Sequence, residues 1–222
     1  MIRVKICGIT SAADARLCVE AGADALGFIF VEGTPRFIEP AAAAAIIAWL
    51  PPFVTPVGIF WDHAGGHVKA IAEQCRLGAL QFHGQELPEA LADHRLPVIK
   101  TIKLPPASTI EGMPEYRVGK RFEALQYFKV AAALLLDTAV RWSEGEARKP
   151  IEWKQAATVA SVYQNKPRPK VILSCGLTPE NVVRAIGIVK PFAVDVNSGV
   201  EASPGTKDPD KVRRFVAAAR SA

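Results

Sequence analysis

The sequence is poor in cysteine. It has four cysteines in 222 residues, at positions 7, 18, 75 and 175, and none of them form a C-x-x-C pair. A disulfide framework and a structural zinc site are both disfavoured by this spacing. We therefore expect a protein of the reducing cytoplasm.

Long apolar runs are also missing. The longest, Ala41 to Leu50, is followed by Pro51 and Pro52 and falls far short of the ~20 residues that cross a bilayer. The first six residues interleave charged and apolar side chains, which is unlike a signal peptide. We therefore expect no membrane association.

Charge of one sign is not gathered anywhere. The 27 Lys and Arg exceed the 22 Asp and Glu by five, and no basic run is longer than a pair such as Lys120-Arg121. Proteins that bind nucleic acids usually concentrate basic residues on one face. The scattered surplus argues against a nucleic-acid partner and favours a small anionic substrate.

What the sequence does contain is a regular alternation of short β-rich runs and helical periodicity. We predict eight strands, over residues 4–7, 25–30, 56–60, 79–83, 98–102, 133–137, 170–174 and 192–197. Their spacing averages roughly 27 residues, close to that of a (β/α)₈ barrel. We therefore predict an α/β fold, a TIM barrel of eight parallel strands with outer helices in a single domain, 1–222. An open doubly wound sheet is the alternative, but it usually has fewer strands and a G-x-G-x-x-G turn.

Several predicted helices have recognisable boundaries. Thr10 or Ser11 caps a helix that ends at Gly22. Thr178-Pro179-Glu180 and Asp208-Pro209-Asp210 each combine a cap, a first-turn proline and a first-turn acid. An apolar stripe between the fifth and sixth strands consists of Val118, Phe122, Leu125 and Phe128.

In such barrels the chemistry is found where strands end. Cys7 can act as a base or nucleophile there, although most free cysteines are small buried hydrophobes and position alone favours that alternative. Asp137 follows six apolar residues, and burial would favour the protonated form that a general acid needs. Its alternative role is a helix N-cap, and neither role prevails on sequence alone.

Other polar residues fall at the same end. His83 can serve as a base or as the partner of a carboxylate, but a lone strand-end histidine is more often structural. Arg36 can clamp a carboxylate or phosphate, or be solvated. Asp195 alternates with two valines, so it can simply point into the barrel interior. Gln81 and Asn197 also lie at strand ends.

Glycines follow the last two predicted strands. Gly176 and Gly199 lie in the loops where these barrels often bind phosphate on backbone N–H groups. Each glycine alone is only a turn residue. Together, in a mildly basic chain, they favour a phosphorylated substrate.

Six segments combine into a recognisable pattern. They are residues 4–10, 25–30 with 34–36, 81–84, 134–138, 176–182, and 195–201 with 204–208. In this order they closely resemble the phosphoribosylanthranilate isomerase family of tryptophan biosynthesis, from the first strand to the last helix. The resemblance implies the Amadori rearrangement of N-(5-phosphoribosyl)anthranilate to 1-(2-carboxyphenylamino)-1-deoxyribulose 5-phosphate.

The resemblance also implies residue roles. Cys7 matches the base that removes the C2′ proton, and Asp137 matches the acid that protonates the ring oxygen. Arg36 matches the arginine that faces the anthranilate carboxylate. The further substrate-binding residues are Gln81, His83, Gly176, Asn197, Ser198 and Gly199. No metal or cofactor is implied, because the reaction is redox-neutral overall, and we expect a monomer or homodimer.

The sequence departs from the family in places. Residues 139–146 replace a Gly-Gly-Thr-Gly type segment, Cys175 stands where a second glycine is common, and Thr34 and Asn197 replace the usual serines. These changes leave two alternatives: a divergent aldose-ketose isomerase acting on another aminated phosphosugar, and a non-catalytic phosphosugar-binding barrel. The presence of both Cys7 and Asp137 argues against the second.

Overall fold

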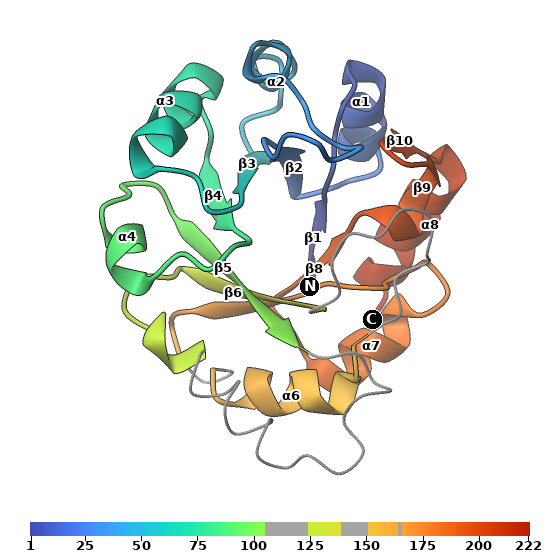
Figure 1. Ribbon diagram of the computed structural model, residues 1–222. Helices are drawn as coiled ribbons and strands as arrows, with labels where there is room; N and C mark the ends of the chain where they lie inside the picture. Colours follow the sequence, from blue (N-terminus) through green and yellow to red (C-terminus); the bar gives the residue numbers. More distant parts are fainter. Residues whose placement is uncertain (105–123, 139–150, 164–165) are drawn as a thin grey trace.

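A closed ring of eight strands surrounded by helices forms the structure, a computed structural model that describes residues 1–104, 124–138, 151–163 and 166–222 (Figure 1). The parallel strands pair in sequence order, and the pairing of the first with the eighth closes the ring. The predicted (β/α)₈ barrel is therefore confirmed, and the open sheet is excluded.

The elements follow one another in strict alternation over most of the chain. The strands of the barrel are β1 (Arg3–Ile6), β2 (Ala25–Ile29), β3 (Thr55–Phe60), β4 (Ala79–Phe82), β5 (Val98–Leu104), β6 (Ala133–Thr138), β7 (Lys170–Leu173) and β8 (Ala193–Val196). The helices are α1 (Ala12–Glu20), α2 (Pro40–Ile47), α3 (Gly65–Cys75), α4 (Pro88–Ala92), α6 (Trp153–Ser161), α7 (Val182–Val189) and α8 (Pro209–Arg220). Between β8 and α8 lie a 3₁₀ turn, η2 (Ser198–Val200), and a small antiparallel ribbon, β9 (Glu201–Ser203) with β10 (Thr206–Lys207).

The barrel interior changes character along its axis. Alternate residues of each strand point inward. Near the amino ends these residues form an apolar cluster of Val57, Ala79, Ile99, Ala133, Leu135, Ile172 and Ala193. Towards the carboxyl ends the buried residues include Cys7, Gln81, Asp137 and Asp195. The buried polar side chains therefore lie at the carboxyl end of the barrel, and the apolar cluster fills its amino end.

The first and last helices have the predicted boundaries. The Ser11 hydroxyl caps α1 by accepting a hydrogen bond from the Asp14 N–H at 3.1 Å. Asp208 caps α8 in the same way, through the N–H groups of Asp210 and Lys211. The apolar face predicted for α8 is buried: Val212, Phe215, Val216 and Ala219.

Two helix predictions differ from the structure, one in where the helix begins and one in which residues are buried. The helix expected from Thr178 begins at Val182, because the Asn181 side chain accepts a hydrogen bond from the Thr178 N–H and donates one to the Gly176 carbonyl, which folds a turn first. Leu125 and Phe128, placed on the apolar stripe before β6, are 37% and 38% exposed.

The residues buried in that stretch are Ala124 and Tyr127. The Tyr127 hydroxyl donates a hydrogen bond to the Glu86 carbonyl at 3.0 Å, and its ring lies beside the Lys100 ammonium. These polar partners turn Tyr127 inward, which the apolar spacing could not indicate. Val118 and Phe122 lie outside the described residues.

Candidate active site

Cys7 directly follows β1 at the carboxyl end of the barrel. Its N–H donates a hydrogen bond to the Val196 carbonyl at 2.8 Å, which extends the β1–β8 pairing. The side chain clusters with Ile29 and Ile59, and the residue is 6% exposed. A Cβ added to Gly27 would lie 2.8 Å from the Cys7 sulfur, so that glycine leaves the space that the sulfur occupies.

Charged groups also surround Cys7 electrostatically. Lys5 precedes it by two residues and therefore shares its inward face. The Lys5 Nζ lies 2.7 Å from the Asp195 Oδ1, and the Ser174 hydroxyl donates to the Asp195 Oδ2 at 3.1 Å. Asp195 thus points into the barrel, as expected. Burial disfavours the Lys5 ammonium, but Asp195 and Cys7 outweigh burial and raise the Lys5 pKa.

The Cys7 sulfur experiences opposing influences. Burial is the largest and raises the pKa of the thiol, and the Asp195 carboxylate raises it further. The ammonium groups of Lys5 and Lys207 lower it through their charge, Lys5 more than Lys207. The net effect is a thiol pKa above the ordinary value, with Lys5 as the main opposing group.

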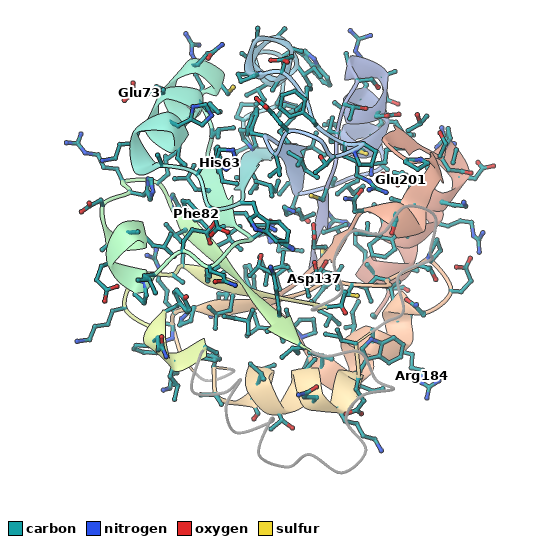
Figure 2. All side chains as sticks on the ribbon, viewed as in Figure 1. His63, Glu73, Phe82, Asp137, Arg184 and Glu201 are labelled. Carbon is teal, nitrogen blue, oxygen red and sulfur yellow. The ribbon has the colours of Figure 1, made fainter. Side chains whose placement is uncertain are left out.

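Asp137 lies inside the ring of strands, within β6 (Figure 2). It is 3% exposed, and its Oδ1 accepts a hydrogen bond from the Thr138 N–H at 2.7 Å. The His83 Nε2 lies 3.7 Å from its Oδ2. The residues that would follow it in a capped helix, 139–150, lie outside the described residues, as does the segment that departs from the family pattern.

His83 and Gln81 approach the site from β4. His83 is buried immediately after the strand, and its ring lies 5.0 Å from the Trp61 ring. Gln81 is buried within the strand, and its Nε2 lies 3.5 Å from the Thr101 hydroxyl. Its Oε1 makes no hydrogen bond to any of the described residues. Buried polar atoms of this kind commonly bind water or a ligand.

Arg36 is held by a carboxylate of the protein itself. Its Nε and Nη2 donate to the two oxygens of Glu201 at 2.8 and 2.6 Å. The Lys207 Nζ lies 3.2 Å from the same carboxylate, and the Gly205 N–H donates to it. This pairing fixes the guanidinium over Gly8, whose missing Cβ would lie 3.0 Å from the Arg36 Cδ.

The loops after β7 and β8 are in contact with each other. Gly176 has a φ of +61°, and Cys175 before it has the left-handed value +70°. A Cβ at Gly199 would collide with the Leu177 carbonyl oxygen, so a glycine is required at that approach. Ser198 begins η2. These features bring the two predicted phosphate loops together.

Asn197 connects the second of these loops to the ribbon. Its Oδ1 accepts a hydrogen bond from the Lys207 Nζ at 3.1 Å. The same oxygen would lie 2.7 Å from a Cβ at Gly8, so the loops after β1 and β8 also lie against each other.

We did not predict functional roles for Lys5, Glu201 or Lys207 from the sequence. The alternation with Cys7 was a usable signal for Lys5, because residues two apart on a strand share a face. No local signal marked Glu201, whose partner Arg36 is 165 residues away.

Among the residues that the structure describes, no group of three or more His, Cys, Asp or Glu side chains could hold a metal ion. Within the same residues, none of the helices has the length and hydropathy of a membrane span.

Comparisons with known proteins agree over almost the whole chain. The sequence model of the N-(5′-phosphoribosyl)anthranilate (PRA) isomerase family matches residues 4–218. The N-(5′-phosphoribosyl)anthranilate isomerase of Geobacter sp. (strain M21) is 43% identical over 220 residues, which are 99% of this chain and 98% of the relative.

Solved structures agree as well. Phosphoribosyl anthranilate isomerase from Thermotoga maritima matches with a TM-score of 0.86 at 38% identity, over 100% of both chains. A structure of phosphoribosyl anthranilate isomerase in complex with reduced 1-(o-carboxyphenylamino)-1-deoxyribulose 5-phosphate matches with a TM-score of 0.82 at 38% identity, also over 100% of both chains.

Proposed function

The chain belongs to the N-(5′-phosphoribosyl)anthranilate isomerase family, and we propose that it carries out this isomerisation with Cys7 as general base and Asp137 as general acid. It is an isomerase of tryptophan biosynthesis. The substrate opens its ribose ring and becomes 1-(2-carboxyphenylamino)-1-deoxyribulose 5-phosphate.

The proposed reaction needs one proton delivered and one removed. Asp137 gives its proton to the ring oxygen as the C1′–O bond breaks, and the amine lone pair forms a C=N bond. The Cys7 thiolate then takes the C2′ proton, and the electrons of that C–H bond form an enolamine that tautomerises to the ketone. General acid and base groups of this kind each contribute about 10²- to 10⁴-fold.

One observation carries the proposal: two reactive side chains are buried at the carboxyl end of the barrel, on strands that do not pair with each other. Cys7 follows β1, whose neighbours are β2 and β8, while Asp137 lies on β6 between β5 and β7. Opposite roles need groups in separate environments. Burial also excludes water from the proton transfers.

Other residues support binding of the two anionic ends of the substrate. Arg36 is the proposed contact of the anthranilate carboxylate, and its bond to Glu201 fixes its orientation. The touching loops of Gly176 and Gly199 are the proposed phosphate site. The remaining proposed contacts are Gln81, His83, Asn197 and Ser198.

The proposed function is tested by following the fluorescence of phosphoribosylanthranilate with purified protein. Loss of fluorescence that depends on the protein, together with growth of a tryptophan auxotroph lacking its own isomerase, is the expected result. Turnover of a different aminated phosphosugar, with none of phosphoribosylanthranilate, would establish the divergent isomerase instead. Binding of phosphosugars without turnover of either would establish the non-catalytic barrel.

The setting of the enzyme is proposed as well. We infer that residues 1–222 form one barrel domain and that the chain acts in the cytoplasm as a monomer or homodimer on its small-molecule substrate, without nucleic acid. The four cysteines are free and buried, which supports a reducing compartment.

A further inference from the structure

We propose that Lys5 is a positioning residue for the base, because its buried ammonium stabilises the Cys7 thiolate that removes the C2′ proton. The inference rests on the proposed function of Cys7. It assigns a role to a side chain that acts on the substrate only through the Cys7 sulfur.

Lys5 lies two residues before Cys7 and on the same face of the chain. Lys5 and Cys7 flank Ile6, so both side chains point into the barrel, and Lys5 is 3% exposed. Its register partner on β8 is Asp195, whose Oδ1 lies 2.7 Å from the Lys5 Nζ. A hydrogen bond from Ser174 fixes the other Asp195 oxygen. The ammonium is therefore anchored to Asp195 rather than free to move.

The surroundings of Cys7 explain why a cation is needed there. Ile29 and Ile59 give the sulfur an apolar wall, which favours the neutral thiol. Three charged groups act electrostatically on the sulfur among the described residues: Lys5 from β1, Asp195 from β8 and Lys207 from β10. Lys207 is shared with Asn197 and Glu201, and of the two cations Lys5 lowers the thiol pKa more. Lys5 is thus the cation that best offsets burial.

The proton balance leaves Lys5 charged throughout. The thiolate accepts the C2′ proton and becomes a thiol, and the electron pair of the C–H bond stays on the substrate. Burial opposes the Lys5 ammonium, but Asp195 and Cys7 raise the Lys5 pKa, so the ammonium keeps its own proton.

The test measures how substitutions of Lys5 change the reactivity of the Cys7 thiol. The rate at which iodoacetamide alkylates Cys7 is measured against pH, with the Cys7 peptide resolved by mass spectrometry from those of Cys18, Cys75 and Cys175. Lys5→Met removes the cation, and we expect alkylation at pH 8 to slow by about tenfold or more.

Two further variants separate charge from structure. Lys5→Arg keeps the charge and should restore much of the alkylation rate. Lys100→Met is the matched control, because Lys100 lies on β5, is 2% exposed, and has its Nζ 2.6 Å from the Glu86 carboxylate. It should leave the Cys7 alkylation profile unchanged.

Turnover gives the second readout. In Lys5→Met we expect kcat to fall by about the same factor as alkylation, with KM little changed. A folded Lys5→Met protein with the parent's alkylation profile would overturn the inference. Alkylation needs no turnover, so failure of the proposed function would appear separately, as a parent protein that does not consume phosphoribosylanthranilate.

Discussion

Arg36 and Glu201 form a buried bidentate ion pair that joins the loop after β2 to the ribbon after β8. The two N···O distances are 2.8 and 2.6 Å, although the residues are 165 positions apart in sequence. Charge-assisted pairs of this geometry are among the strongest hydrogen bonds in proteins. The pair therefore fixes the orientation of the Arg36 guanidinium, which is the proposed contact of the substrate carboxylate.

The first prediction is that Glu201→Gln destabilises the protein strongly. Removing one partner leaves the Arg36 charge buried, which costs about 3–5 kcal/mol. Urea unfolding at pH 7 measures the loss. Glu180→Gln is the control, since Glu180 and Arg214 also lie 2.6 Å apart but each side chain is 61% exposed. The control should change the free energy of unfolding by about 0.5 kcal/mol at most, and equal losses would contradict the account.

The second prediction gives this effect a pH dependence. Burial alone would raise the pKa of Glu201, but Arg36 and Lys207 outweigh it and hold that pKa below its ordinary value of 4.5. The stabilisation from a lowered carboxyl pKa is present above pH 4.5 and is lost as pH falls through the folded-state value. The difference in unfolding free energy between parent and Glu201→Gln should therefore shrink below pH 4.5. A difference that stays constant to pH 3 would contradict it.

The third prediction concerns the phosphate loops. Gly199→Ala places a Cβ against the Leu177 carbonyl, which forces the two loops apart. We expect KM for phosphoribosylanthranilate to rise by about tenfold or more, as a loss of about 1.4 kcal/mol of binding would give. Gly187→Ala is the control, because nothing lies within 4 Å of a Cβ there and the residue is inside α7. It should stabilise the helix by about 0.5–1 kcal/mol and leave KM unchanged.

The fourth prediction concerns the general acid. Asp137→Asn keeps the shape of the side chain but removes the acidic proton, so kcat should fall by about 10²- to 10⁴-fold with little change in KM. Steady-state kinetics measure this. Asp14→Asn, at a buried carboxylate on α1, should retain the activity of the parent protein. An Asp137→Asn enzyme with normal kcat would require another proton donor.

The fold could be predicted because its signals are local. Alternating and helical periodicity recur at regular spacing, and parallel strands bring their carboxyl ends together, so Cys7 and Asp137 were expected at the same end of the barrel. The boundaries that failed depend on specific side chains. Asn181 folds a turn that delays α7, and Tyr127 is drawn inward by polar partners.

The ion pairs of the site could not be predicted in the same way. Lys5 meets Asp195 only because β1 closes the ring onto β8 in one particular register. Arg36 meets Glu201 because two loops converge. Neither contact can be predicted from the spacing of residues along the chain. The position of Lys5 relative to Cys7 is the exception, since strand alternation alone places them on one face.

The Cys7 thiolate is proposed to remove the C2′ proton, so the single-turnover rate of Cys7→Ala with phosphoribosylanthranilate is the decisive measurement. We expect a loss of about 10²-fold or more relative to the parent protein. Cys18→Ala, at a buried thiol on α1, should keep the parent's rate. A Cys7→Ala enzyme that converts substrate at the parent's rate would contradict the claim.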